Sequence, residues 1–132
     1  MKKQLLMMAL ASGLLVATQA NAMTRDEYKA ASDRIEADYK AAKAQCDALK
    51  DNAKDVCEKE AKGKQNVAKA ELEHSYKPSP AAARKVAEEK VKAEYEVAKE
   101  KCDDMKGDAK NACEKEAKAA EARGKAEVRA MK

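Results

Sequence analysis

The feature that most constrains the fold is a pair of cysteines with ten residues between them, which occurs twice. Cys46 and Cys57 recur 56 residues later as Cys102 and Cys113, and the residues around them match as well. Both copies open with Cys-Asp and end with Cys-Glu-Lys-Glu-Ala-Lys. Two copies are too few for a solenoid, so the pattern predicts a duplicated helical hairpin.

The start of the chain has the three parts of a secretory signal peptide. Two lysines precede an apolar stretch over residues 5–16, and residues 20–22 read Ala-Asn-Ala, a small-x-small cleavage site. The apolar stretch is shorter than the ~20 residues that a membrane-spanning helix needs. We therefore expect cleavage between Ala22 and Met23, a periplasmic location and no stable membrane insertion.

The only two prolines of the chain, Pro78 and Pro80, separate the two cysteine units. Proline cannot continue a helix, whereas Ser79 can cap a new one with Pro80 at its first position. The expected segments are a signal peptide (1–22), a first hairpin (23–77), a Pro-Ser-Pro linker (78–80) and a second hairpin (81–132).

The fold class that the sequence predicts is all-α, with about four helices. One stripe of residues in each unit follows spacings of three and four residues, as in a coiled-coil-like seam. Its members are Tyr28, Ser32, Ile35, Tyr39, Ala42, Cys46 and Leu49, then Ala87, Val91, Tyr95, Ala98, Cys102 and Met105. Only nine residues after position 22 are Leu, Ile or Val, so burial alone stabilises little and disulfides are expected to matter.

Four cysteines in a small exported chain predict two disulfides. In a continuous helix, Cys46 and Cys57 would be about 16.5 Å apart, beyond the ~7 Å that a disulfide can span between Cα atoms. A local bridge therefore requires a bend. Asp51-Asn52 and Gly107-Asp108 lie midway in the two pairs. Asp51 and Gly107 can close the preceding helix in a left-handed conformation, and Asn52 and Asp108 can cap the next one.

These turn residues favour the pairs Cys46–Cys57 and Cys102–Cys113. One long hairpin that bends at the prolines would instead pair Cys46 with Cys113 and Cys57 with Cys102. The third connectivity, Cys46–Cys102 with Cys57–Cys113, would need parallel packing of equivalent helices. The sequence leaves all three open.

No catalytic site and no cofactor are expected. His74 is the only histidine, and no set of nucleophile, base and orienting residue can be assembled around it. The ten-residue cysteine spacing is longer than that of structural zinc sites. Acidic residues nearly match basic ones, with a net charge of +4, so nucleic acid is not an expected partner.

The pattern Cys-Asp…Ala-Lys-x-x-Cys-x-x-Glu-Ala-Lys, present twice after a signal peptide, resembles that of a group of small exported proteins of Gram-negative bacteria. The composition is also similar to the Ala/Lys/Glu-rich stalks of Tol-type envelope proteins. The resemblance implies an exported location and an all-α fold, and it implies no catalytic or binding residue.

The sequence thus predicts a soluble periplasmic helical protein without enzymatic activity, with a structural, stress or interaction role in the cell envelope. One alternative is a periplasmic metal or small-ligand binder that uses cysteines and carboxylates. Another is a coiled-coil component whose seams are completed by a helical partner or by self-association. The sequence does not identify the partner.

Overall fold

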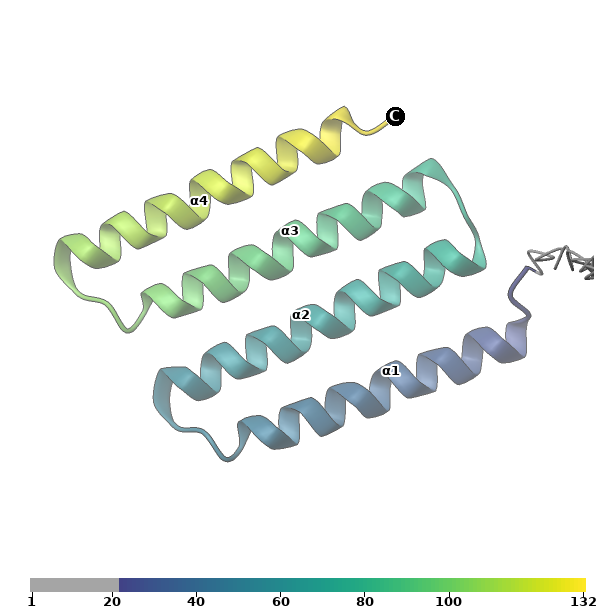
Figure 1. The fold of residues 1–132 in the computed structure, drawn as a ribbon, viewed down its shortest axis with the longest axis horizontal. Helices are drawn as coiled ribbons and strands as arrows, with labels where there is room; N and C mark the ends of the chain where they lie inside the picture. The colour runs from purple at the N-terminus through teal and green to yellow at the C-terminus, as the bar shows by residue number, and fades with distance from the viewer. Residues whose placement is uncertain (1–21) are drawn as a thin grey trace, which may run out of the picture.

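The computed structural model of the chain describes residues 22–132, so nearly all of the predicted signal peptide lies outside the described residues. Four helices follow one another: α1 (Arg25–Cys46), α2 (Asp51–Tyr76), α3 (Pro80–Cys102) and α4 (Gly107–Ala130). No strand occurs among the described residues. The predicted all-α fold of two helical hairpins, α1–α2 and α3–α4, is confirmed (Figure 1).

Two of the helices begin at the residues that the capping rules favour. Thr24 and Glu27 form a capping box at the start of α1, in which each side chain bonds the other's backbone N–H. This hydrogen bonding lowers the pKa of Glu27. At the start of α3, the N–H of Ala82 donates to Ser79 Oγ at 2.9 Å, and Pro80 occupies the first turn as expected.

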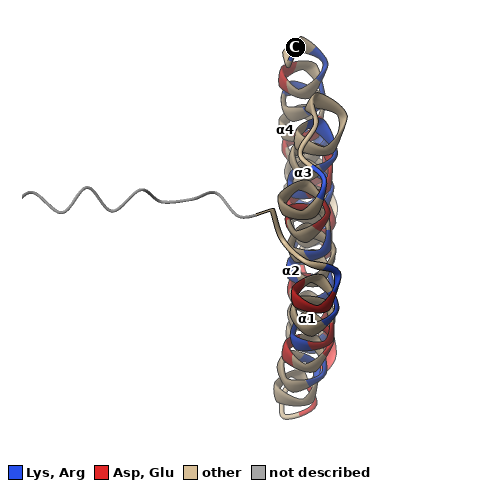
Figure 2. Ribbon diagram, turned by 90° about the vertical axis from the view of Figure 1, so that its right-hand side faces the viewer, with Lys and Arg blue, Asp and Glu red and all other residues tan. Residues whose placement is uncertain are grey.

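The four helices lie side by side in a single antiparallel row (Figure 1). Among the described residues, each helix contacts only its neighbours in the sequence: α1 with α2, α2 with α3, and α3 with α4. Figure 2 views this row along its edge and shows one layer of helices. The layer therefore has two broad faces that no other element of the described chain covers.

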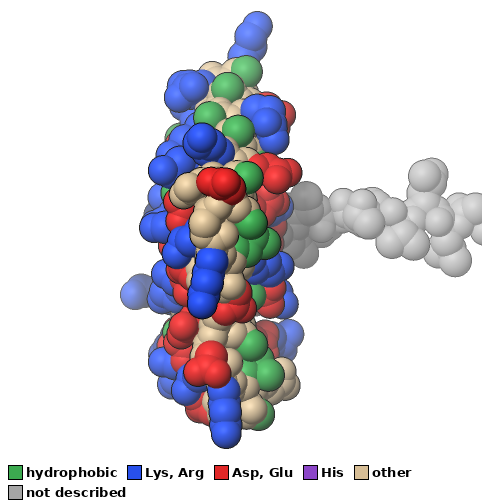
Figure 3. Space-filling view, turned by 90° about the vertical axis from the view of Figure 1, so that its left-hand side faces the viewer, with side chains coloured by type: hydrophobic (Ala, Val, Ile, Leu, Met, Phe, Trp, Pro, Cys, Tyr) green, Lys and Arg blue, Asp and Glu red, His purple; other side chains and the backbone are tan. Residues whose placement is uncertain are grey.

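Little of the layer is buried, and what is buried is small. Only Cys46 and Cys102 have fully buried side chains. The other buried residues are Ala61, Gly63, Gln65, Ala70, Leu72, Ala117 and Val128. Hydrophobic side chains also gather along one flank of the layer in Figure 3. Because small side chains dominate the contacts, neighbouring helices can approach closely.

Two glycines mark the closest approaches between helices. A Cβ atom on Gly63 of α2 would lie 2.8 Å from the Cβ atom of Ala93 in α3. A Cβ atom on Gly124 of α4 would lie 2.7 Å from a methyl group of Val91 in α3. The residue that corresponds to Gly63 in the second unit is Ala119, which is exposed on the edge helix α4. The two units therefore differ in the residue at this position. The α2 helix packs against α3 there and has glycine, whereas α4 has no further neighbouring helix and has alanine.

Ion pairs join the two hairpins along the α2–α3 contact. The three pairs are Lys59–Glu96 at 3.3 Å, Glu71–Lys90 at 2.9 Å and Glu60–Lys101 at 3.8 Å. All six side chains remain substantially exposed, so these pairs fix the register of the two helices more than they add to stability.

Polar contacts also link α1 to α2. Glu36 accepts a hydrogen bond from the Gln65 amide at 2.8 Å and lies 3.5 Å from Lys69 Nζ. The Tyr28 hydroxyl donates to Glu73, and this hydrogen bond raises the pKa of Tyr28. The Tyr28 ring also lies 4.7 Å from the ring of Tyr76. The open end of the first hairpin is thus closed by aromatic and polar contacts.

Replacing Gly63 by Val should separate α2 from α3. We expect Gly63→Val to lower the free energy of unfolding by about 2 kcal/mol, because the new side chain overlaps the Ala93 Cβ atom. Ala119→Val is the matched control at the corresponding position of α4, and it should cost at most about 0.7 kcal/mol through helix propensity. Urea unfolding followed by circular dichroism measures both. Equal losses in the two variants would show that the close approach is absent.

Candidate functional site

The most sharply defined sites of the molecule are the two disulfide-closed bends. Cys46 bonds Cys57 with 5.5 Å between their Cα atoms, and Cys102 bonds Cys113 with 5.7 Å. No cysteine is free, and all four lie within the described residues. The preferred local pairing is confirmed, and the structure has neither the long-hairpin connectivity nor the parallel one.

The helix breaks fall at the expected places, but their local geometry differs from the prediction. Asp51 and Gly107 do have positive φ angles, 54° and 59°. However, each is the first residue of the following helix rather than the closing residue of the preceding one. The predicted N-caps Asn52 and Asp108 lie inside α2 and α4, so that part of the prediction is wrong.

The end of α1 explains the difference. Its last carbonyl groups accept tight hydrogen bonds from residues three positions later, with Asp47 bonding Ala44 at 3.2 Å and Leu49 bonding Cys46 at 3.0 Å. These bonds satisfy the helix end without a left-handed residue. The chain then crosses to α2 over residues 47–50, and the positive φ angle is needed only where α2 starts.

The bends also expose two large apolar side chains. Leu49 and Met105 were predicted to close the seam at the end of each first helix. Each is instead 42% exposed, in the segment between the helices. The reason is that α1 and α3 end at their cysteines, three residues before Leu49 and Met105.

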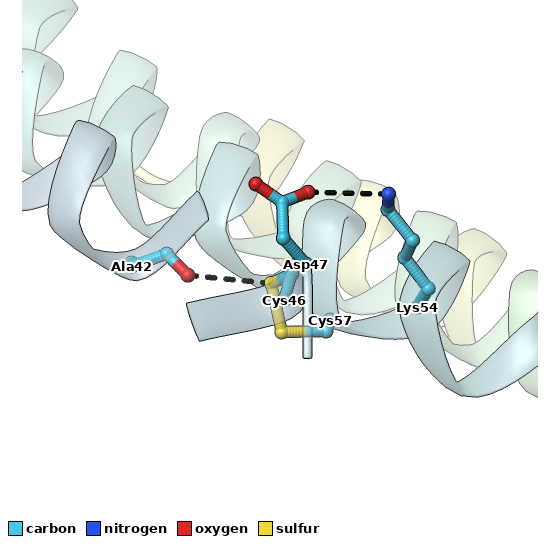
Figure 4. Close-up of a disulfide and its surroundings, with 5 residues drawn as sticks. All are labelled: Ala42, Cys46, Asp47, Lys54 and Cys57. Atoms are coloured by element: carbon cyan, nitrogen blue, oxygen red, sulfur yellow. Dashed lines mark hydrogen bonds and ion pairs between the residues drawn. A yellow bond between two sulfur atoms is a disulfide. The ribbon is translucent and has the colours of Figure 1, made fainter. Parts of the chain in front are cut away.

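One ion pair spans each bend at corresponding positions. Asp47 lies 3.1 Å from Lys54 Nζ (Figure 4), and Asp103 lies 3.1 Å from Lys110 Nζ. The hydrogen bond to Asp47 raises the pKa of Lys54. Sequence reasoning missed these pairs, although their residues belong to the Cys-Asp and Ala-Lys parts of the shared pattern. Their proximity depends on the path of the bend, which sequence spacing alone does not give.

The first sulfur of each bridge is completely buried. Cys46 and Cys102 have no exposed surface. The Sγ atom of Cys46 lies 3.3 Å from the carbonyl oxygen of Ala42 (Figure 4), and that of Cys102 lies 3.2 Å from the carbonyl oxygen of Ala98. Because a disulfide sulfur carries no proton, these are polar packing contacts rather than hydrogen bonds. The bridges are thus parts of the helix–helix contact.

No group of three or more His, Cys, Asp or Glu side chains among the described residues is arranged to hold a metal ion. His74 is half-buried near the end of α2, with no hydrogen-bond partner for Nδ1 within the described part of the chain.

A groove of about 510 Å³ lies between α3 and α4. Val91, Tyr95 and Val128 line it within a rim of Lys, Arg and Glu. A smaller groove of about 300 Å³ between α1 and α2 has Ile35 and Tyr39 at the corresponding positions. Neither lining contains a serine, cysteine or histidine, and both grooves combine apolar contact with charge.

Within residues 22–132, no helix has both the length and the apolar character that crossing a membrane would require. Comparisons with protein-family models, with curated protein sequences and with solved structures give no match to the chain.

Replacing Gly107 by Ala tests the positive φ angle at the second bend. We expect Gly107→Ala to lower the free energy of unfolding by about 1 kcal/mol, because a Cβ atom disfavours the left-handed region. Nothing lies within 4 Å of the added Cβ atom, so the cost is one of backbone conformation alone. The converse change at the first bend, Asp51→Gly, is the control and should cost less than about 0.5 kcal/mol, because glycine adopts this conformation without strain. A larger loss in Asp51→Gly than in Gly107→Ala, in thermal unfolding, would contradict this account.

Proposed function

We propose that the chain is exported to the periplasm, is cleaved after Ala22, and acts there as a non-enzymatic helical protein that binds partners through its exposed faces. The observation that carries the proposal is the complete pairing of the four cysteines at the two bends. Structural disulfides form and persist in oxidising compartments such as the bacterial periplasm. The resemblance to small exported proteins of Gram-negative bacteria points to the same location.

The open layer supports a binding role over a catalytic one. Its two broad faces are uncovered along the full length of four helices (Figure 2). Its ionisable side chains are spread over those faces, and neither the α1–α2 groove nor the α3–α4 groove is lined by serine, cysteine or histidine. A structural, stress-related or interaction role in the envelope needs only the faces themselves.

The alternative of a metal or small-ligand binder has less support. Metal coordination by cysteine requires thiolates, and all four sulfurs are engaged in disulfides. Carboxylates alone would remain as ligands.

Export and oxidation can be measured together on the full-length chain expressed in a Gram-negative host. We expect the protein in the periplasmic fraction to have the mass of a chain that starts at Met23. Alkylation before reduction should add no label, and alkylation after reduction should add four. Leu10→Arg, which disrupts the apolar stretch of the signal, is the control and should leave an uncleaved chain with four reactive thiols in the cytoplasm. Wild-type protein that retains residues 1–22, or has reactive thiols before reduction, would refute the proposal.

A further inference from the structure

Hydrophobic side chains, many of them alanines, gather on one face of the helical layer (Figure 3), and we call it the alanine-rich face. Asp38 and Lys64 line a groove between α1 and α2, and Lys64 and Glu94 line a groove between α2 and α3. Because Lys64 lines both grooves, they open on the same face of the layer. Ala42, Val97 and Ala98 line the same two grooves. This face forms the flank in Figure 3 where hydrophobic side chains gather.

The grooves of the opposite face show which residues of α4 belong to the alanine-rich face. The α3–α4 groove and the other two α2–α3 grooves share Glu89 and Lys92, and α4 contributes Lys125 to the α3–α4 groove. Residues two positions away from Lys125 point to the other side of the helix, because each residue turns by about 100°. Arg123 and Glu127 therefore lie on the alanine-rich face.

Four charged residues form a central row across this face, one on each helix. The levels along the helices follow from three contacts between neighbours: Cys46 with Cys57, Gly63 with Ala93, and Val91 with Gly124. Counting from these contacts places the four residues at the same level to within about three residues, each of which rises 1.5 Å along the helix. They are Asp38, Lys64, Glu94 and Arg123, and all four are exposed. Their charges alternate across the layer.

A second row crosses the face one helical turn away. It consists of Arg34, Glu71, Lys90 and Glu127, again one residue per helix and all exposed. Lys90 Nζ lies 2.9 Å from a carboxylate oxygen of Glu71, so these two long side chains meet on this face. The charges alternate in this row too, in the opposite order to the central row.

We propose that a second copy of the chain binds the alanine-rich face about a two-fold axis that runs parallel to the helices, midway between α2 and α3. This axis places α1 on α4 of the second copy, and α2 on its α3. It reverses the order of each row, so every charge meets its opposite: Asp38 meets Arg123 of the second copy, and Lys64 meets its Glu94. The inference goes beyond the proposed function and does not depend on the compartment.

A two-fold axis perpendicular to the helices would place each helix on its own copy. If this axis passed through the central row, Asp38 would face Asp38 and Lys64 would face Lys64, and like charges placed opposite each other are costly. If it passed between the two rows, Asp38 would face Arg34 of the second copy and Arg123 would face its Glu127. Asp38 and Arg123 would not meet in that arrangement, so exchanging their charges in one double variant distinguishes it from the axis parallel to the helices.

The face is large enough for a stable dimer. Helices of 22–26 residues are about 35 Å long, and four helices packed 8–10 Å apart span a similar width. Pairing two such faces would bury roughly 2,400 Å² in total, more than the 1,200–2,000 Å² of a standard interface. The alanines let the two layers approach, and the charge rows fix their register.

The pair Asp38–Arg123 gives the sharpest test. Within one chain, α1 and α4 have no contact among the described residues, so Asp38 and Arg123 can meet only between copies. Exchanging the two charges tests that meeting directly. The protein to use is the oxidised chain from Met23 onward, which contains all four helices.

Sedimentation equilibrium should show a dimer of the unmodified chain. We expect Asp38→Arg and Arg123→Asp to weaken dimerisation at least tenfold each, because each brings like charges together. The double variant should restore the dissociation constant to within threefold. Lys118→Asp, with the same charge change on the opposite face of α4, is the matched control and should leave it unchanged. Circular dichroism should show the same helix content in all variants.

A chain that stays monomeric at 100 μM would overturn the proposal. It would also fail if the double variant dimerised as weakly as the single variants, or if Lys118→Asp weakened the dimer as much as Arg123→Asp. A defined assembly larger than a dimer would contradict the closed two-fold pairing.

Discussion

The fold depends on one covalent bond at each bend. The bridges Cys46–Cys57 and Cys102–Cys113 hold the end of one helix against the start of the next. Each closes a loop of about 12 residues, which in the chain-entropy model stabilises the folded state by ~2.8 kcal/mol. That contribution is large here because few side chains are buried: among the described residues, only those of Cys46 and Cys102 are fully buried. Each disulfide therefore acts both as a covalent link and as a centre of packing.

The remaining contacts follow from helices built of small and charged residues. Where α2 and α3 meet, Gly63 allows a close approach and ion pairs set the register. No described element lies on the faces of the row, so their charges stay in solvent, and any binding must use the pattern of those charges. The alternating rows on the alanine-rich face are such a pattern. In the function that we propose, binding is a property of these surfaces, and the bends keep them in register.

The local structure of the chain could be predicted from its sequence. Proline and serine at the linker, glycine at one bend and the spacing of the cysteines indicated helices, their breaks and the local disulfides. The exact role of Asp51 could not be read, because the end of α1 is satisfied by tight hydrogen bonds that depend on the path of the bend. The single-row arrangement was also not predicted. Each of the inner helices, α2 and α3, packs against two neighbours and therefore has two contact stripes. On α2, the stripe toward α3 consists of small residues such as Gly63 and Ala70. A search for large apolar residues does not find such a stripe.

The central claim, that each hairpin is closed by its own bridge, can be tested by a tryptic digest without reduction. Cleavage after lysine and arginine places each cysteine in a separate peptide: residues 44–50, 55–59, 102–106 and 111–115. The digest should be made after blocking free thiols, to prevent exchange, and read by mass spectrometry. The account predicts that 44–50 is linked to 55–59, and 102–106 to 111–115. Links of 44–50 to 111–115 and of 55–59 to 102–106 would establish a single long hairpin and contradict the account.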